Sequence, residues 1–169
     1  VLEPEVAISH QNLGLAYRQL GQRQRATRSF MEALRIEPNL IGARYHLGMD
    51  YLSQNAYVKA GAAFERVLEQ DATCAGAYLG LGLVHMQIGD WRRAIDGFQQ
   101  ATLIAPDSVV AEFYLGWSQA EIGDMTQAKR TWTDLLAQDP PIELVERIGI
   151  MLAEREDLGS QEVLMDNGP

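Results

Sequence analysis

The chain has 169 residues, of which 47% are hydrophobic and 22% are charged, and this composition is ordinary for a folded domain. Its formal net charge of −9 argues against nucleic acid as the main partner, because neutralising a phosphate backbone requires a concentrated basic surface. No apolar run approaches the length of a membrane-spanning helix, so we expect no direct membrane insertion by this segment.

The sequence does not identify the cellular compartment of the protein. The single cysteine, Cys74, excludes an internal disulfide and favours a reducing compartment only weakly. The chain begins at Val1 without a methionine, which is compatible with a processed or trimmed product. An upstream signal peptide, membrane anchor or domain is therefore left open.

Residues 1–6 are too short for a helix of their own, and we expect them to form an N-terminal lead-in. A unit of 34 residues then occurs four times without insertion or deletion, at 7–40, 41–74, 75–108 and 109–142. Each unit contains a leucine-glycine pair, an alanine, and an aromatic residue four positions after that alanine. The pairs begin at Leu13, Leu47, Leu81 and Leu115, the alanines are Ala26, Ala60, Ala94 and Ala128, and the aromatic residues are Phe30, Phe64, Phe98 and Trp132. A fixed period of this length is typical of stacked structural repeats.

Each unit is predicted to be a pair of helices. In the first unit, Leu13, Ala16, Tyr17 and Leu20 follow the three-and-four spacing of an amphipathic helix. A residue that readily takes the left-handed conformation ends each first helix, at Gly21, Asn55, Gly89 and Gly123. The second helices are predicted to end near Arg35, Glu69, Leu103 and Ala137.

The glycine of each leucine-glycine pair predicts a close approach between helices. Glycine inside a helix costs about 1 kcal/mol relative to alanine, so its recurrence at one position indicates that another backbone passes nearby. We expect the neighbour of Gly14 to be Ala26, and the same in the other units. Because one helical pair cannot bury its aromatic residue alone, the units should stack into one continuous core.

These repeated residues, together with Pro38, Pro106 and Pro140 near the ends of three units, resemble the tetratricopeptide repeat family. The resemblance extends over residues 7–142 and implies an all-α fold, a right-handed superhelical solenoid of four helix-turn-helix repeats. The second unit departs from the family pattern, because Asp50 occupies a position where the family has a small apolar residue. A carboxylate there needs a partner or a route to water.

Residues 143–158 predict one more amphipathic helix, with Leu144, Ile148, Met151 and Leu152 on one side. It is similar to the helix that caps arrays of this family, and it should cover the exposed face of the fourth repeat. Residues 159–169 are expected to be an acidic flexible tail. The first repeat has no matching cover, which predicts an upstream element or a partner at that end.

The sequence shows no set of residues suited to catalysis or to binding a metal or cofactor. His10, His46 and His85 fall at different positions of their repeats, so they should not converge on a metal ion. Cys74 has no sign of a histidine partner, and no nucleophile or phosphate-binding motif is present. We therefore expect no metal, no cofactor and no enzymatic activity.

The resemblance places the candidate binding surface on the first helix of each repeat, where the family lines a concave groove. Register carries these groove positions onto Leu15, Tyr45, Met49, Leu52, Leu79, Leu83, Met86, Phe113 and Trp117. The strip from Tyr45 to Trp117 is apolar with almost no charge. Family members that grip the C-terminal carboxylates of chaperones have lysine and asparagine at sites that hold Gln11 and Leu15 here, so that function is not expected.

An exposed apolar strip predicts a non-catalytic scaffold or assembly factor for protein–protein interaction, with an apolar or amphipathic segment of another protein in the groove. A second reading is a constitutive structural subunit of a larger complex, or a head-to-tail oligomer that joins the basic first repeat to the acidic tail. In a third, the chain's own terminal helix or tail closes the groove. The only basic concentration comprises Arg18, Arg23, Arg25 and Arg28, and it is either a solvated edge or an electrostatic docking site for an acidic partner.

Overall fold

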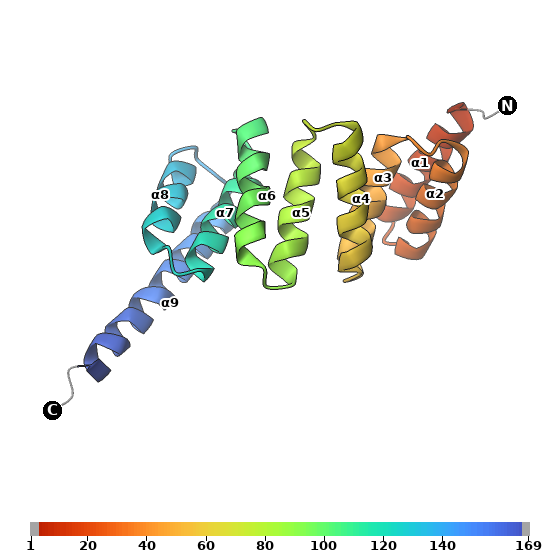
Figure 1. The fold of residues 1–169 in the computed structure, drawn as a ribbon. Coiled ribbons are helices and arrows are strands. Elements are labelled where there is room, and N and C mark those ends of the chain that lie inside the picture. Colours follow the sequence, from red (N-terminus) through yellow and green to blue (C-terminus); the bar gives the residue numbers. More distant parts are fainter. Residues whose placement is uncertain (1–3, 167–169) are drawn as a thin grey trace.

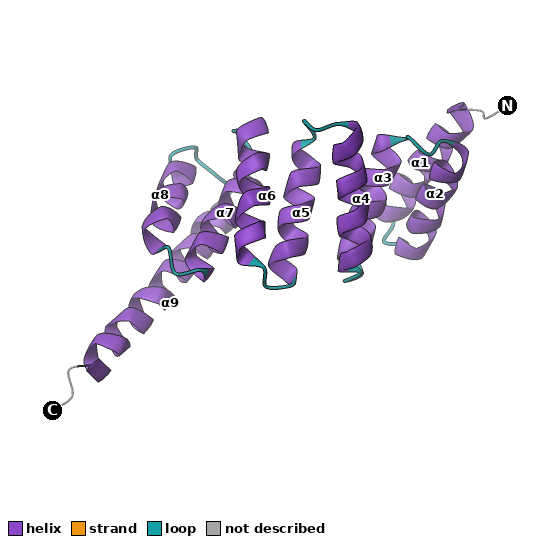
Figure 2. Cartoon of the chain, viewed as in Figure 1, coloured by secondary structure: helices purple, strands orange, loops and turns teal. Residues whose placement is uncertain are grey.

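The computed structural model describes the backbone of residues 4–166 and the side chains of residues 4–155. Within this part of the chain the secondary structure is entirely helical (Figure 1; Figure 2). The helices are α1 (Pro4–Gln19), α2 (Arg23–Ile36), α3 (Ile41–Ser53), α4 (Tyr57–Gln70), α5 (Ala75–Gln87), α6 (Trp91–Ile104), α7 (Val109–Glu121), α8 (Met125–Leu136) and α9 (Ile142–Asp166).

Consecutive helices form pairs, and the pairs stack along the molecule from α1 and α2 at one end to α7 and α8 at the other (Figure 1). The first helices of successive pairs also touch, since α3 contacts both α1 and α5. A stack curves toward the side on which its elements lie closest, so these first helices line the inner side. The expectation of an all-α solenoid of helical pairs is confirmed.

The turns inside the pairs contain the four predicted left-handed residues. The φ angles are 71° at Gly21, 58° at Asn55, 77° at Gly89 and 86° at Gly123. This conformation lets the residue after the turn bond back to the helix, as the amide of Gln22 does to the carbonyl of Tyr17 at 2.8 Å. The second helices end within one residue of the predicted positions.

The core of each pair is built on the alanine and the aromatic residue of its second helix, and these side chains are buried in all four repeats. The expectation that alanine faces the glycine was wrong, because the aromatic ring does. A Cβ atom at Gly82 would lie 2.5 Å from Cε1 of Phe98, and one at Gly14 would lie 2.6 Å from Cε1 of Phe30. The glycine therefore makes room for a ring on the opposite helix.

A direct approach of two backbones occurs in the third pair. A Cβ atom at Gly97 in α6 would lie 2.8 Å from the backbone nitrogen of Gly82 and 3.0 Å from the carbonyl oxygen of Tyr78, both in α5. The backbone contact that the sequence suggested for every pair is thus seen where the second helix supplies a glycine of its own.

The N-terminal boundary also differs from the expectation of a separate lead-in. Helix α1 begins at Pro4, so residues 4–6 belong to it, and residues 1–3 lie outside the described part. Proline suits the first turn of a helix because its missing N–H group would have no partner there. The outward face of α1 is uncovered, since Leu13 is 42% exposed whereas its equivalents Leu47 and Leu115 are 7% and 8% exposed.

The C-terminal helix is longer than predicted. Helix α9 continues past Leu158 to Asp166, so most of the expected flexible tail is helical, and residues 167–169 lie outside the described part. The first half of α9 packs on the last pair, where Ile148 is buried with Trp132 and Leu135. The second half points away from the stack (Figure 1).

The contact between glycine and ring predicts that Gly82→Ala destabilises the fold although alanine favours helix. The new methyl group would overlap the buried Phe98 ring, and overpacking of this kind costs about 1–3 kcal/mol. Gly61→Ala in α4 is the matched control, because its Cβ atom would have only Val84 nearby, at 3.9 Å. Denaturant unfolding should show a loss for Gly82→Ala and a gain of up to about 1 kcal/mol for Gly61→Ala. Equal stability of the two variants would contradict the contact.

Candidate functional site

Most of the predicted groove residues are half-buried side chains on the inner helices. They are Leu15 in α1, Tyr45, Met49 and Leu52 in α3, Leu79 and Leu83 in α5, and Trp117 in α7. The other two do not belong to an open surface, since Met86 is 8% exposed and Phe113 is 1% exposed. Met86 instead packs with Phe98 and Leu115 in the core.

Helix α9 covers the part of the strip that belongs to α7. The Arg147 guanidinium lies 5.3 Å from the centre of the Phe113 ring and 5.5 Å from that of Trp117. Arg155 donates hydrogen bonds to the carbonyl of Ala120 and to the Glu121 carboxylate. The terminal helix therefore closes the groove at its α7 end, which was the third possibility drawn from the sequence. The expectation that Phe113 is exposed was wrong.

The position of Arg147 could have been found in the sequence from the repeat period, although not from the residue types. Arg147 stands one 34-residue period after Phe113, so α9 takes the place that the first helix of a further repeat would have. The leucine-glycine pair is missing there, which is why periodicity alone identifies the position. The open part of the strip accordingly runs along α1, α3 and α5.

Two glycines shape the floor of this open part. A Cβ atom at Gly42 would lie 2.7 Å from the side-chain oxygen of Gln11, and one at Gly76 would lie 3.1 Å from the Tyr45 ring. Each glycine lies in the first turn of an inner helix and leaves room for a side chain of the preceding repeat against that helix. Tyr45 is held further by Phe64, whose ring centre is 6.0 Å away. The Tyr45 ring is therefore fixed before any partner arrives.

Comparison with known proteins identifies the architecture. Three family models, each described as a tetratricopeptide repeat, match residues 7–40, 51–114 and 110–141. The chain belongs to the tetratricopeptide repeat family. No curated protein sequence gives a significant match.

Solved structures share this repeat fold. MamA from Desulfovibrio magneticus RS-1 is 26% identical over 81% of this chain and 76% of its own, with a TM-score of 0.74. Another MamA crystal structure is 22% identical over 91% of this chain and 85% of its own, with a TM-score of 0.78. The tetratricopeptide repeat domain of Arabidopsis OM64 is 16% identical over 69% of this chain and 96% of its own, with a TM-score of 0.67.

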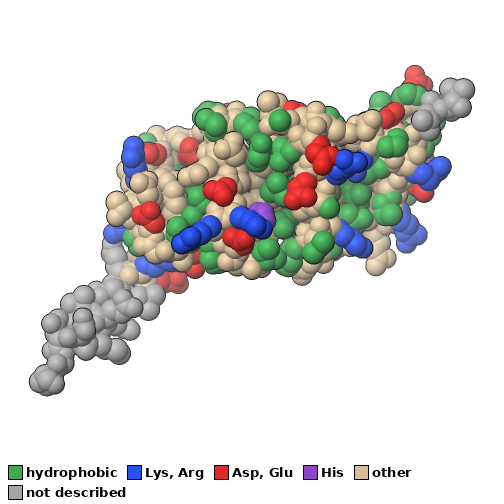
Figure 3. Space-filling model, in the orientation of Figure 1, with side chains coloured by type: hydrophobic (Ala, Val, Ile, Leu, Met, Phe, Trp, Pro, Cys, Tyr) green, Lys and Arg blue, Asp and Glu red, His purple; other side chains and the backbone are tan. Residues whose placement is uncertain are grey.

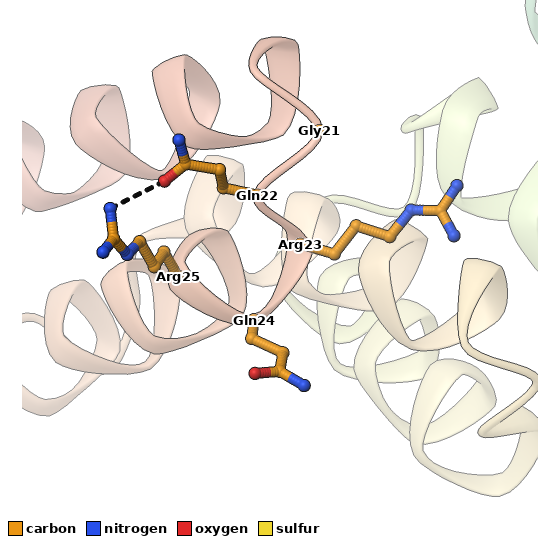
Figure 4. A pocket seen from close by; sticks show the side chains of 5 residues that line it. All are labelled: Gly21, Gln22, Arg23, Gln24 and Arg25. Carbon is orange, nitrogen blue, oxygen red and sulfur yellow. Dashed lines mark hydrogen bonds between the residues drawn. The ribbon is translucent and has the colours of Figure 1, made fainter.

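The predicted basic cluster, Arg18, Arg23, Arg25 and Arg28, is spread over three cavities, and each cavity is lined by two of its members. Arg25 lies over the Tyr17 ring at 5.7 Å and donates to the Gln22 side chain at 2.8 Å (Figure 4). Arg25 and Arg28 line a cavity on the outward side of the repeat, and Arg25 lines another cavity together with Arg23. On the face seen in Figure 3, Lys and Arg side chains occur along the whole length of the molecule, including the α1 and α2 end. Arg18 and Arg23 instead line an inner cavity with residues of α3.

Metal-binding and membrane-spanning features are missing from the described part of this repeat protein. No group of three or more His, Cys, Asp or Glu side chains there is arranged to hold a metal ion. His46 is hydrogen-bonded to Arg18 at 3.2 Å, and His10 lines the outward cavity. None of the helices searched there is long and apolar enough to cross a membrane.

Asp50 has both the partner and the route to water that its position required. It is 2% exposed, accepts a hydrogen bond from the Thr27 hydroxyl at 3.4 Å, and borders the inner cavity. Burial raises the pKa of its carboxyl above the ordinary value of 3.8, although the charge of Arg18, the Thr27 bond and the charge of Arg23 act in the opposite direction. Asp50 thus holds its proton to higher pH in the folded state than in the unfolded chain.

This raised pKa predicts how Asp50→Asn changes stability with pH. Where the folded state binds more protons than the unfolded state, the free energy of unfolding falls as pH rises. The unmodified chain should therefore lose stability relative to Asp50→Asn as the pH is raised from about 4 through the range in which the carboxyl ionises. Asp96→Asn, at an exposed site on α6, is the control. Parallel stability curves for the unmodified chain and Asp50→Asn would show that Asp50 is not buried as described.

Proposed function

We propose that the chain is a non-catalytic interaction scaffold whose inner surface holds an apolar or amphipathic segment of another protein. The observation that carries the proposal is the uncovered apolar strip on α1, α3 and α5. Its members are Leu15, Tyr45, Met49, Leu52, Leu79 and Leu83. The equivalent surface on α7 is covered by α9, so the strip is open over the first three repeats and closed at the fourth.

The residue types in the strip suit a helical partner. Tyr45 is a large ring already held in place by Gly76 and Phe64, so little conformational entropy is lost when a partner packs on it. Met49 beside it is flexible and can fill gaps against different side chains. Leu79 and Leu83 stand four residues apart on α5 and present one apolar face. An amphipathic helix with anchors every three or four residues matches such a surface.

A structural role in an assembly is the second candidate, and it has its own observation. Leu13 on the outward face of α1 is 42% exposed at a position that is buried in the second and fourth repeats. This end face would be covered in a larger complex or in a head-to-tail oligomer. A mass in solution that rises with protein concentration would favour the oligomer over a groove-binding monomer.

The groove proposal predicts which substitutions abolish binding. Peptides selected on the unmodified chain from a random display library should carry apolar residues at helical spacing. Replacing both Leu79 and Leu83 by alanine should weaken their binding about 30-fold or more, which corresponds to about 2 kcal/mol, because these leucines form the floor. Affinity would be measured by isothermal titration calorimetry.

The matched control replaces Val58 and Leu103 by alanine, since both are strongly exposed outside the groove on α4 and α6. This variant should bind as the unmodified chain does, and both variants should retain cooperative thermal unfolding. Selected peptides that bind the groove variant at full strength would refute the proposal, and so would a selection that enriches no peptide.

A further inference from the structure

The inner cavity between the first and second repeats has a composition that sets it apart from the apolar strip. It measures about 420 Å³ and is lined by the end of α1, the start of α2 and the inner face of α3. The lining residues are Arg18, Gly21, Arg23, Tyr45, Met49, Asp50 and Ser53. Tyr45 and Met49 belong to both the cavity and the strip, so a segment lying in the groove would reach the cavity without a break.

Arg18 is oriented by a neutral partner. Its Nη1 atom lies 3.2 Å from Nδ1 of His46. Burial lowers the pKa of His46, and the charge of Arg18 lowers it further, so at neutral pH the imidazole is uncharged and accepts a hydrogen bond from the guanidinium. A guanidinium has five N–H donors, and this contact uses one of them. The positive charge of Arg18 is therefore held in position without being neutralised.

Arg23 brings a second positive charge to the cavity. It begins α2, and its side chain extends in a direction opposite to that of Arg25 (Figure 4). Within the described residues, the Arg23 guanidinium makes no hydrogen bond and no ion pair. Both arginines of the cavity thus retain donors for an incoming group.

Asp50 is the only acidic residue in the lining, and it offsets the charge of the two arginines only from a distance. Neither arginine forms an ion pair with it within the described residues, and its carboxylate accepts from Thr27 instead. Its buried position limits the groups that fit. Asp50 would repel a dianionic phosphate more strongly than a singly charged carboxylate, and guanidinium groups bind a carboxylate through paired hydrogen bonds.

We propose that this cavity is a carboxylate subsite, in which Arg18 and Arg23 bind an aspartate or glutamate side chain of the segment held in the groove. The inference rests on the proposed function and specifies its partner as an apolar helix with an acidic side chain at the end that lies over the first repeat. The carboxylate fixes the direction of the segment along the groove, since the arginine-lined cavity lies at one end of the open strip.

The test uses a set of amidated amphipathic peptides with identical apolar residues and a single glutamate placed in turn at each polar position, with an all-glutamine peptide as reference. Affinities would be measured by calorimetry on the unmodified chain and on Arg23→Gln, Arg18→Gln and Arg28→Gln. One glutamate position should increase affinity about tenfold over the reference at low salt. Arg23→Gln and Arg18→Gln should each remove most of that increase, and Arg28→Gln, outside the cavity, should preserve it.

The outcomes separate the two proposals. Peptides that bind through Leu79 and Leu83 but gain nothing from any glutamate would overturn the subsite and leave the groove intact. If Arg28→Gln removed the glutamate-dependent increase in affinity as fully as Arg18→Gln and Arg23→Gln do, the increase would reflect a general attraction to the basic end of the molecule. That result would also overturn the subsite. If no peptide of the set binds, both proposals fail. A carboxylate can also come from the C-terminus of a peptide, and the reference peptide with a free C-terminus tests this source. If its affinity rises while no internal glutamate raises affinity, the cavity binds a chain terminus.

Discussion

The contact between a helical glycine and an aromatic ring is the constraint on which this molecule depends. In each repeat the ring of the second helix lies where a Cβ atom of the first helix would be, as Phe98 does over Gly82 and Trp132 over Gly116. The ring is fully buried by this arrangement, and the two helices of the pair take one separation and one register. The contact recurs at the same position in every unit, at Gly14, Gly48, Gly82 and Gly116.

Stacking of identical pairs determines where function can reside. The second helices use their apolar face for the core. Each first helix turns its glycine toward the ring of the second helix and carries a row of side chains on its other side. That row becomes the inner surface. Nothing within the described residues covers it over α1, α3 and α5, whereas α9 covers it on α7 through Arg147. The same helix therefore shields the last pair from water and marks the end of the open strip.

The sequence predicted the parts of the fold that depend on local chemistry. Gly21 and Asn55 end their helices as expected, because residues that accept a positive φ angle leave few alternatives at a helix end. The partner of Gly14 was predicted incorrectly, since spacing along one helix does not tell which residue of the next helix faces it. The end of α9 was misplaced because composition suggested a tail where the backbone continues as a helix.

The candidate site was predictable only in part, for a related reason. Repeat register identifies which residues share the inner face, and it did so for Tyr45, Met49, Leu79 and Leu83. It cannot tell that a helix outside the repeats lies over Phe113, nor that Arg18 and Arg23 share a cavity with residues of α3 that Arg25 does not line. These facts depend on how α9 and the α1–α2 turn sit against neighbouring helices.

The central claim is that a partner binds along the inner helices, and methionine methyl groups report on it directly. Met49 lies in the strip on α3, whereas Met31 is exposed on α2 and Met125 begins α8, both outside the strip. Methyl NMR spectra recorded during titration with a selected peptide should show the largest shift at Met49, with Met31 and Met125 nearly unchanged. A binding peptide that shifts Met31 or Met125 and leaves Met49 in place would contradict the account.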